Sequence, residues 1–342
     1  MFEIKNLSKS YPLKHGGEAH VLKDINLKIL KGKITAIIGP SGSGKSTLSK
    51  CLSLLEKPSH GELILDGIKL NHLNSEEIRL QRQKIGLVFQ SASLLKRRTA
   101  AENIALPLEF LGVVENQIQE RVEYLLENVK LTDRAHHYPN QLSGGQQQRV
   151  GIARALALQP SIVIADEATS GLDPDSTQSI LKLLTELRDE LGLSVILITH
   201  EMDVVRQIAD EVAVLSHGEI VEQGSIIDLV LDPESNVGSK IFPTPKSAAI
   251  SADHIVINAT YSTKKGTPLD WLTQISIELN LAFEINASTV ESINGYTVGK
   301  TVFSLPEHIF TAHAEKIYSR LDQLNIHYAP IHKLNVQAGQ AA

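Results

Sequence analysis

Three short apolar runs in the first 230 residues have the length and composition of buried strands. They are Ile34–Ile38, Ile162–Ala165 and Val195–Ile198, and longer polar or helical segments separate them. Continuous apolar runs of this length are typical of parallel sheets that helices cover on both faces. We therefore predict that residues 1–230 form an α/β domain with a largely parallel sheet.

Between about residues 91 and 160 the pattern changes from strand-like runs to helical periods. Apolar residues recur at helical spacing in 101–112, 117–129 and 144–158. Because strand-like runs flank this region on both sides, we predict a helical insertion within the α/β domain.

A domain boundary is predicted after residue 231. Segment 232–252 contains three prolines and several serines and has no clear period, which is typical of a linker. Beyond it, residues 253–335 show strand and helix patterns in the order βαββαβ, with Asn294-Gly295 as a turn between the middle strands. That order predicts a small α+β domain with the ferredoxin-like split motif. The strands are predicted at His254–Thr260, Leu281–Ala287, Tyr296–Leu305 and Asn325–Ile331, and the helices at Pro268–Leu279 and Glu307–Leu324.

The segment from residue 39 to residue 46 fits the phosphate-loop pattern G-x-x-x-x-G-K-[ST]. Glycines allow backbone N–H groups to curl around an anion, and the following helix presents its positive end to phosphate. Lys45 can reach the outer phosphates, and Ser46 can ligate Mg²⁺. A Gly-Ser turn without a ligand is the alternative, but the apolar strand directly upstream favours nucleotide binding. The predicted nucleotide-binding residues here are Gly39, Pro40, Ser41, Gly42, Ser43, Gly44, Lys45, Ser46 and Thr47.

Two of the predicted strands end in polar side chains that suit phosphate chemistry. Asp166 and Glu167 follow Ile162–Ala165, and His200 follows Val195–Ile198 after one residue. Ligands of open α/β sheets bind at the carboxyl ends of the strands. Asp166 suits a Mg²⁺ contact, Glu167 suits activation of water for attack on a γ-phosphate, and His200 can donate a hydrogen bond to phosphate. The alternative is that Asp166 and Glu167 are ordinary solvated carboxylates at the start of a loop. A phosphate loop on the same sheet argues against this alternative.

Composition and charge narrow the function classes. The 342-residue chain has 33 basic and 39 acidic side chains, and a formal net charge of −6 gives no general attraction to nucleic acid or anionic lipid. No apolar run approaches the roughly 18 residues of a membrane span, and the N-terminus lacks the apolar core of a secretory signal. Cys51 is the only cysteine, which excludes an internal disulfide and favours a cytosolic setting.

A further motif, Leu142-Ser143-Gly144-Gly145-Gln146, directly precedes a helical pattern and completes a set of motifs in a fixed order along the chain. Together these motifs resemble the nucleotide-binding subunit of an ATP-binding-cassette (ABC) transporter over residues 1 to about 230. The resemblance implies a P-loop NTPase cassette that binds ATP and Mg²⁺.

The resemblance also implies a role for each motif. Tyr11 resembles the aromatic residue that stacks on adenine, although aromatic residues are common in strands. Gln90 matches the glutamine that touches Mg²⁺ or the lytic water, and Asp173 lies in a loop that crosses the dimer interface. The signature residues Ser143, Gly144 and Gly145 match those that reach the γ-phosphate of an ATP held by a second protomer. The implied catalytic residues are Glu167, His200, Lys45 and Gln90, and the implied Mg²⁺ ligands are Ser46, Gln90 and Asp166.

One set of motifs per chain implies that two chains complete two composite sites in a head-to-tail dimer. Segments 54–58, 102–109 and 197–205 resemble bacterial methionine-importer ATPases more narrowly. That resemblance implies transmembrane permease subunits, a periplasmic or lipid-anchored solute-binding protein, and a peripheral position on the cytoplasmic face of the bacterial inner membrane.

The methionine-importer resemblance further implies a C-terminal domain that binds methionine and inhibits transport. The candidate ligand contacts, all near strand ends, are Phe283, Asn286, Ile293 and Tyr296. A dimerisation module without a ligand is the alternative for this domain, because the ferredoxin-like fold alone implies no ligand.

Three alternatives for the whole chain stay open at this point. One is an importer ATPase for another amino acid or small solute. Another is a soluble ABC ATPase of DNA repair or translation, but such chains usually show two cassettes, long coiled coils or zinc sites. The third is a regulatory binding module whose cassette is only structural, and the complete set of catalytic residues argues against it. With one cassette and a negative net charge, we expect no nucleic-acid partner.

Overall fold

The computed structural model describes residues 1–14, 16–247, 250–251 and 253–331, and the chain forms two compact units. The first unit is Met1–Gly224 and the second is Ser225–Ala342. No helix in the described part of the chain is long and apolar enough to cross a bilayer.

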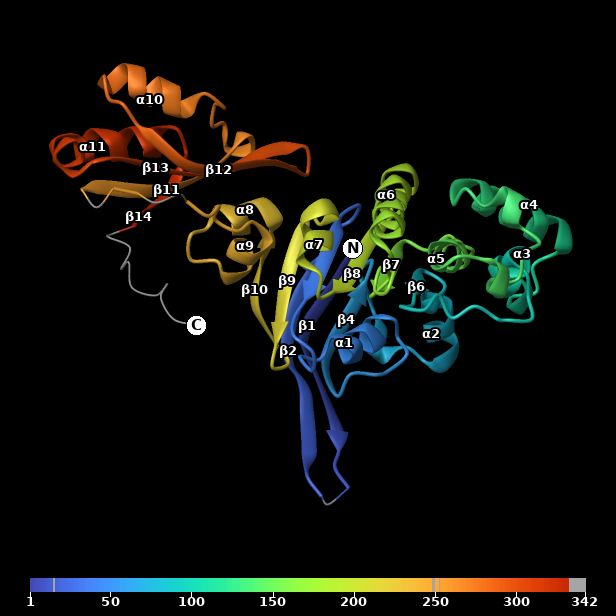
Figure 1. Cartoon of the computed structure of the whole chain (residues 1–342). Helices are drawn as coiled ribbons and strands as arrows, with labels where there is room; N and C mark the ends of the chain where they lie inside the picture. The colour runs from blue at the N-terminus through green and yellow to red at the C-terminus, as the bar shows by residue number, and fades with distance from the viewer. Residues whose placement is uncertain (15, 248–249, 252, 332–342) are drawn as a thin grey trace, which may run out of the picture. The chain divides into compact units, whose positions relative to one another are not determined.

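The first unit is built around a six-stranded sheet with the strand order β10-β9-β3-β8-β7-β6 (Figure 1). The pairs β3–β8, β3–β9, β7–β8 and β6–β7 are parallel, and every residue of β3 and β8 is buried. The predicted parallel sheet is therefore confirmed. The strands are β3 (Ile34–Ile38), β6 (Ile85–Val88), β7 (Ile162–Asp166), β8 (Ser194–Thr199), β9 (Glu211–Ser216) and β10 (Glu219–Ser225). The helices α1 (Lys45–Leu52), α2 (Ser75–Arg82), α6 (Pro174–Leu191) and α7 (Met202–Ile208) connect them.

A second, antiparallel sheet in this unit was not anticipated from the hydrophobic pattern. Its strand order is β2-β1-β4-β5, and Figure 1 shows β1 and β2 as a long blue hairpin. Polar residues occupy much of this hairpin, so its strands lack the continuous apolar runs of the parallel sheet. The strands are β1 (Phe2–Pro12), β2 (Glu18–Ile29), β4 (His60–Leu65) and β5 (Ile68–Lys69).

The predicted helical insertion lies between β6 and β7. It contains α3 (Ala100–Phe110), α4 (Glu115–Asn128) and α5 (Gly144–Ala155), and no strand occurs between the two flanking strands. The apolar side chains that α3, α4 and α5 bury belong to one core cluster with residues of β7, β8 and α6. Single 3₁₀ turns occur at Leu70–His72, Thr132–Arg134, Pro139–Gln141 and Thr263–Lys265.

The second unit has the predicted βαββαβ order. The antiparallel sheet has the order β12-β13-β11-β14, and Trp271 packs edge to face with Tyr261 and Phe303 on one side of it. Asn294 and Gly295 both have positive φ and form the predicted turn. The elements are β11 (His254–Ser262), α10 (Trp271–Leu279), β12 (Glu284–Ile293), β13 (Tyr296–Pro306), α11 (Glu307–Gln323) and β14 (His327–Ile331).

The start of the second unit differs from the sequence prediction. The helices α8 (Ile226–Leu231) and α9 (Asn236–Ile241) both belong to this unit, although α9 lies in the predicted linker. Lys300 of the sheet donates to the Phe242 carbonyl at 2.6 Å, and Lys265 pairs with Asp228 of α8 at 2.8 Å. A helix of six residues completes fewer than two turns, so its apolar residues give no readable period.

Candidate functional site

The phosphate loop connects the buried strand β3 to the N-terminus of α1. Gly42 and Gly44 have positive φ, which side chains with a Cβ rarely adopt. At Gly39 a Cβ would lie 2.1 Å from the Leu215 carbonyl oxygen, so the backbone must pass there without a side chain. The glycines thus allow the tight turn that leads the chain into α1.

Lys45 is the first residue of α1 and folds back over the loop. Its Nζ donates to the carbonyls of Gly39 at 2.7 Å and of Pro40 at 2.9 Å. The ammonium group therefore lies on the concave side of the loop, where it adds positive charge to the helix N-terminus. This arrangement favours an anion.

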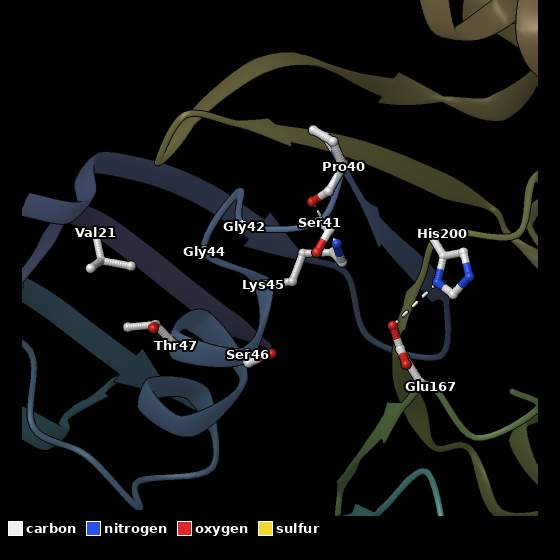
Figure 2. A pocket seen from close by; sticks show the side chains of 10 residues that line it. All are labelled: Val21, Pro40, Ser41, Gly42, Gly44, Lys45, Ser46, Thr47, Glu167 and His200. Carbon is white, nitrogen blue, oxygen red and sulfur yellow. Dashed lines mark hydrogen bonds and ion pairs between the residues drawn. The ribbon is translucent and has the colours of Figure 1, made fainter.

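The carboxyl ends of the neighbouring strands β7 and β8 bring Glu167 and His200 together. Asp166 pairs with Ile198 in the parallel register, and the Glu167 N–H donates to the Ile198 carbonyl at 2.9 Å. His200 Nδ1 lies 3.2 Å from Glu167 Oε1 (Figure 2). Glu167 has a φ of 48°, a left-handed conformation that is uncommon for a residue with a side chain and typical of functional sites.

Asp166 is the last residue of β7 and, like Glu167, is partly buried. Burial raises the pKa of its carboxyl group, while a hydrogen bond with Ser49 and the charge of Lys45 act in the opposite direction. A cation next to this carboxylate would offset the cost of burying the negative charge.

One pocket of about 630 Å³ brings together most of the predicted phosphate-loop residues with Glu167 and His200. The phosphate loop forms one side of it, and Glu167 and His200 lie at another side (Figure 2). Val21 of β2 also lines the pocket, and sequence reasoning missed it because a valine in a strand carries no chemical signal. The lining residues are Val21, Pro40, Ser41, Gly42, Gly44, Lys45, Ser46, Thr47, Glu167 and His200.

Tyr11 is not part of the pocket lining. Its hydroxyl donates to the Glu56 carboxylate, and it also interacts with the side chain of Thr47, which does line the pocket. Tyr11 therefore lies at the border of the pocket, and its stacking on adenine stays a prediction.

Gln90 follows β6, the strand next to β7, and also lies outside the pocket lining. Its Nε2 donates to Ser170 Oγ at 3.1 Å. Both Ala92 and Ser93, which follow it, have positive φ, at 53° and 47°. Arg154 of α5 donates to the carbonyls of both residues, at 2.6 Å and 2.9 Å. A side chain from α5 thus holds the loop after Gln90 in an uncommon conformation.

The signature residues start α5 and do not line the chain's own pocket. Ser143 is the N-cap, with its Oγ accepting from the Gln146 N–H at 3.3 Å. At Gly145 a Cβ would lie 2.9 Å from Ser176 Oγ, so packing against α6 explains this glycine without a ligand. Asp173 caps α6 by accepting from the Ser176 N–H at 2.9 Å.

The four candidate regulatory residues are not brought together. Phe283 and Asn286 lie near the start of β12, and Ile293 and Tyr296 flank the turn at its other end. The seven residue-to-residue steps from Asn286 to Ile293 span roughly 23 Å of strand. Phe283 packs edge to face with Phe303, whereas the Asn286 Oδ1 is buried without a hydrogen-bond partner.

Comparison with known proteins places the cassette and the full chain in one family. The sequence profile of the ABC transporter family matches residues 22–170. The methionine import ATP-binding protein MetN 1 of Rhodococcus jostii is 47% identical over 305 residues, which cover 89% of this chain and 90% of that protein. The methionine import ATP-binding protein MetN of Brucella abortus is 40% identical over 350 residues, covering 99% of this chain and 92% of that protein.

Solved structures of cassettes match the fold. A dimeric ATP-binding cassette in a post-hydrolysis state, bound to ADP and Pi, is 40% identical, with a TM-score of 0.60 over 66% of this chain and 98% of that chain. CbiO1 of Clostridium perfringens, part of an ABC transporter complex, is 31% identical, with a TM-score of 0.60 over 70% of this chain and 98% of that chain. With the phosphate loop, Glu167 and His200 around one pocket, these similarities show that the chain is an ATP-binding ABC-transporter ATPase and belongs to the family of methionine import ATP-binding proteins.

Proposed function

We propose that this chain hydrolyses Mg²⁺-ATP to energise a membrane permease that imports methionine. The observation that carries the proposal is the pocket in which the phosphate loop faces Glu167 and His200. Lys45 would bind the outer phosphates, Glu167 would orient or activate the attacking water, and His200 would donate to the γ-phosphate. The two strand-end side chains are close enough to act together, because His200 Nδ1 and Glu167 Oε1 lie 3.2 Å apart.

The proposed Mg²⁺ ligands are Ser46, Gln90 and Asp166, whose hydroxyl, amide and carboxylate oxygens are donors that Mg²⁺ prefers. The carboxyl of Asp166 is partly buried, which raises its pKa, and this fits a position next to a cation. Within the described residues no group of three or more His, Cys, Asp or Glu side chains could hold a metal. This fits an ion whose remaining ligands are phosphate oxygens and water.

Two variants separate nucleotide binding from hydrolysis. Glu167→Gln should keep Mg-ATP affinity and lower the hydrolysis rate by about 10²- to 10⁴-fold, because the shape stays while the base is lost. Lys45→Ala should weaken ATP binding itself. Equilibrium binding and steady-state ATPase assays measure both effects. A wild-type rate from the Gln variant contradicts the role given to Glu167.

We also propose a head-to-tail dimer with ATP at two composite sites. Ser143 does not line the chain's own nucleotide pocket, and a solved relative is described as a dimeric cassette bound to ADP and Pi. A mixture of Ser143→Arg and Lys45→Ala chains should regain at most one working site per dimer. Full activity from the Ser143→Arg chain alone means that one chain is sufficient.

The permease is proposed to dock where β6 meets the helical insertion. A groove of about 390 Å³ lies there, lined by side chains that include Leu87, Phe89, Leu95, Leu106 and Pro107. Leu95 is 45% exposed, so Leu95→Asp should reduce co-purification with the permease and leave ATP binding intact. Leu13→Asp is the matched control, because Leu13 is a similarly exposed leucine at the β1–β2 turn.

Methionine is the proposed substrate because the full-length relatives are methionine import ATP-binding proteins at 40% to 47% identity. The complex would include a solute-binding protein and sit on the cytoplasmic face of the bacterial inner membrane. Transport assays with the co-expressed permease test the substrate. Uptake of another amino acid in preference to methionine favours an importer of different specificity.

The second unit is proposed to bind methionine and inhibit hydrolysis. The buried Asn286 Oδ1, which lacks a hydrogen-bond partner, supports an amino-acid ligand near the start of β12. Methionine must then bind the resting arrangement more tightly than the ATP-closed one, and typical couplings of about 5- to 150-fold set the expected inhibition. Calorimetry on the full chain, with Asn286→Ala as the variant, tests the ligand. If titration of the unmodified chain with methionine releases or absorbs no heat, the alternative of a dimerisation module without a ligand is favoured.

A further inference from the structure

Glu56 connects the strand that carries Tyr11 to the helix that follows the phosphate loop. Its backbone N–H donates to the Lys50 carbonyl near the end of α1, at 3.1 Å. Its carboxylate accepts from the Tyr11 hydroxyl, and Lys50 Nζ lies 3.3 Å from the other carboxylate oxygen. Tyr11 and Glu56 are 45 residues apart in sequence, so the fold creates this contact.

The Tyr11 ring is held at a second point. Lys9 Nζ lies over the ring, 5.0 Å from its centroid, and donates to the Lys57 carbonyl at 2.8 Å. Lys9 and Tyr11 are two positions apart on β1 and therefore lie on the same side of the strand. With its hydroxyl bonded to Glu56 and one face covered by an ammonium group, the ring has few orientations available.

The charge state of Glu56 suits this role. The Tyr11 hydroxyl bond, followed by Lys50 and Lys9, holds the pKa of the Glu56 carboxyl below its usual range. Hydrogen bonds to an ionised carboxylate are stronger than bonds between neutral groups. The phenol is thus bonded to a carboxylate that stays charged near neutral pH.

We propose that Glu56 is a positioning residue that fixes the orientation of Tyr11 and thereby strengthens binding of the adenine base. The proposal rests on the proposed stacking of Tyr11 on adenine. The location supports it, because the Tyr11 side chain interacts with Thr47, and Thr47 lines the nucleotide pocket. A purely structural ion cluster between β1 and α1 is the competing explanation, and it predicts no difference between ligands with and without a base.

The test compares Mg²⁺ complexes of ATP and of inorganic tripolyphosphate, which has the phosphates and lacks the base. Glu56→Ala in the full chain should weaken ATP binding about 3- to 10-fold, the effect of losing one hydrogen bond, and leave tripolyphosphate affinity unchanged. Glu56→Gln, which still accepts a hydrogen bond, should fall between. Glu62→Gln is the control. Glu62 on β4 forms an ion pair with Lys69 on β5, and this variant should change neither the ATP nor the tripolyphosphate affinity.

A double-mutant cycle with Tyr11→Phe completes the test. Without the hydroxyl, Glu56→Ala should have no further effect on ATP affinity. Equal weakening of ATP and tripolyphosphate by Glu56→Ala overturns the inference, because Glu56 would then act on the phosphate loop through α1. Unchanged ATP affinity in Glu56→Ala overturns it as well.

Tyr11→Ala separates this inference from the function on which it rests. If Tyr11→Ala weakens ATP binding and Glu56→Ala does not, stacking stands and the positioning role is refuted. If Tyr11→Ala leaves ATP binding unchanged, the proposed stacking of Tyr11 on adenine is refuted, and the role of Glu56 is refuted with it. Tripolyphosphate binding in the same preparations shows that each variant is folded around its phosphate loop.

Discussion

Replacing Arg154 by alanine should damage hydrolysis far more than it damages the fold. Its two bonds to the carbonyls of Ala92 and Ser93 fix the loop that follows Gln90. A hydrogen bond from a charged donor contributes about 1.5–3 kcal/mol to stability. Because neither Arg154 bond is fully buried, we take the lower end of this range for each, which gives about 3 kcal/mol for the two bonds together. Two residues with side chains in the left-handed region cost about 1 kcal/mol each at the lower end of their range.

Loss of the bonds and relaxation of the two residues therefore largely offset each other. We expect Arg154→Ala to lower the free energy of unfolding by only about 1 kcal/mol. The relaxed loop would displace Gln90 from its proposed place beside Mg²⁺ and the attacking water, and misplacement by about 1 Å at a reacting centre costs up to roughly 100-fold in rate. A decrease of about 10-fold or more in the ATPase rate, with ATP affinity within about twofold of the unmodified chain, is the expected result.

Urea unfolding, ATP binding and steady-state ATPase on the same preparation measure the three quantities. Arg154→Lys is the matched variant, because it keeps the charge and loses the fork that bonds two carbonyls together. It should be intermediate in rate. A full ATPase rate in Arg154→Ala refutes the reasoning, and so does a loss of stability above about 3 kcal/mol, because the left-handed residues would then store no strain.

Three further changes have expected outcomes. Asp210→Ala removes a mostly buried carboxylate bonded to Arg188 at 3.0 Å, and urea unfolding should show a loss of about 3–5 kcal/mol with unchanged ATP affinity per folded chain. The hydrogen bonds of the α6 cap hold the pKa of the Asp173 carboxyl below its usual range. The stability that this carboxylate contributes is therefore fully present above its unfolded pKa near 4, and it is lost as the pH falls through the lower folded pKa. Asp173→Asn should flatten the dependence of thermal unfolding on pH in that acid range. Gly39→Ala would place a Cβ 2.1 Å from the Leu215 carbonyl, so it should lower both thermal stability and ATP affinity, and normal binding would contradict the close approach.

The local motifs made the phosphate site predictable. Glycine spacing, one lysine and a serine specify the loop, and parallel strands place Glu167 and His200 at one sheet edge, as expected from their positions in sequence. Val21 was not predictable, because its contribution depends on where β2 passes the loop and the side chain has no distinctive chemistry. The same holds for the Tyr11–Glu56 contact, which depends on tertiary structure alone.

The second unit shows the same limit. The order of strands and helices was readable because each element is long enough for a period, but α8 and α9 have six residues each. The sequence pattern therefore places Leu229 at the end of the first domain and Ile241 in the linker, although both are buried in the second unit. The candidate ligand residues are predicted near strand ends, and sequence alone does not show that Asn286 and Ile293 lie far apart on one ten-residue strand.

The cap of α5 has a consequence for how one oxygen atom is shared. A serine hydroxyl has one proton and two lone pairs, and the cap uses a lone pair of Ser143 to accept from Gln146. The cap does not use the hydroxyl proton, so in the proposed head-to-tail dimer this proton would be available to a second chain's nucleotide. Threonine at this position would keep both roles, aspartate would keep the cap and present a negative charge to phosphate, and alanine would lose both. If the proposed dimer forms, helix stability and recognition of the second chain's nucleotide would depend on different parts of the same hydroxyl group and could be altered independently.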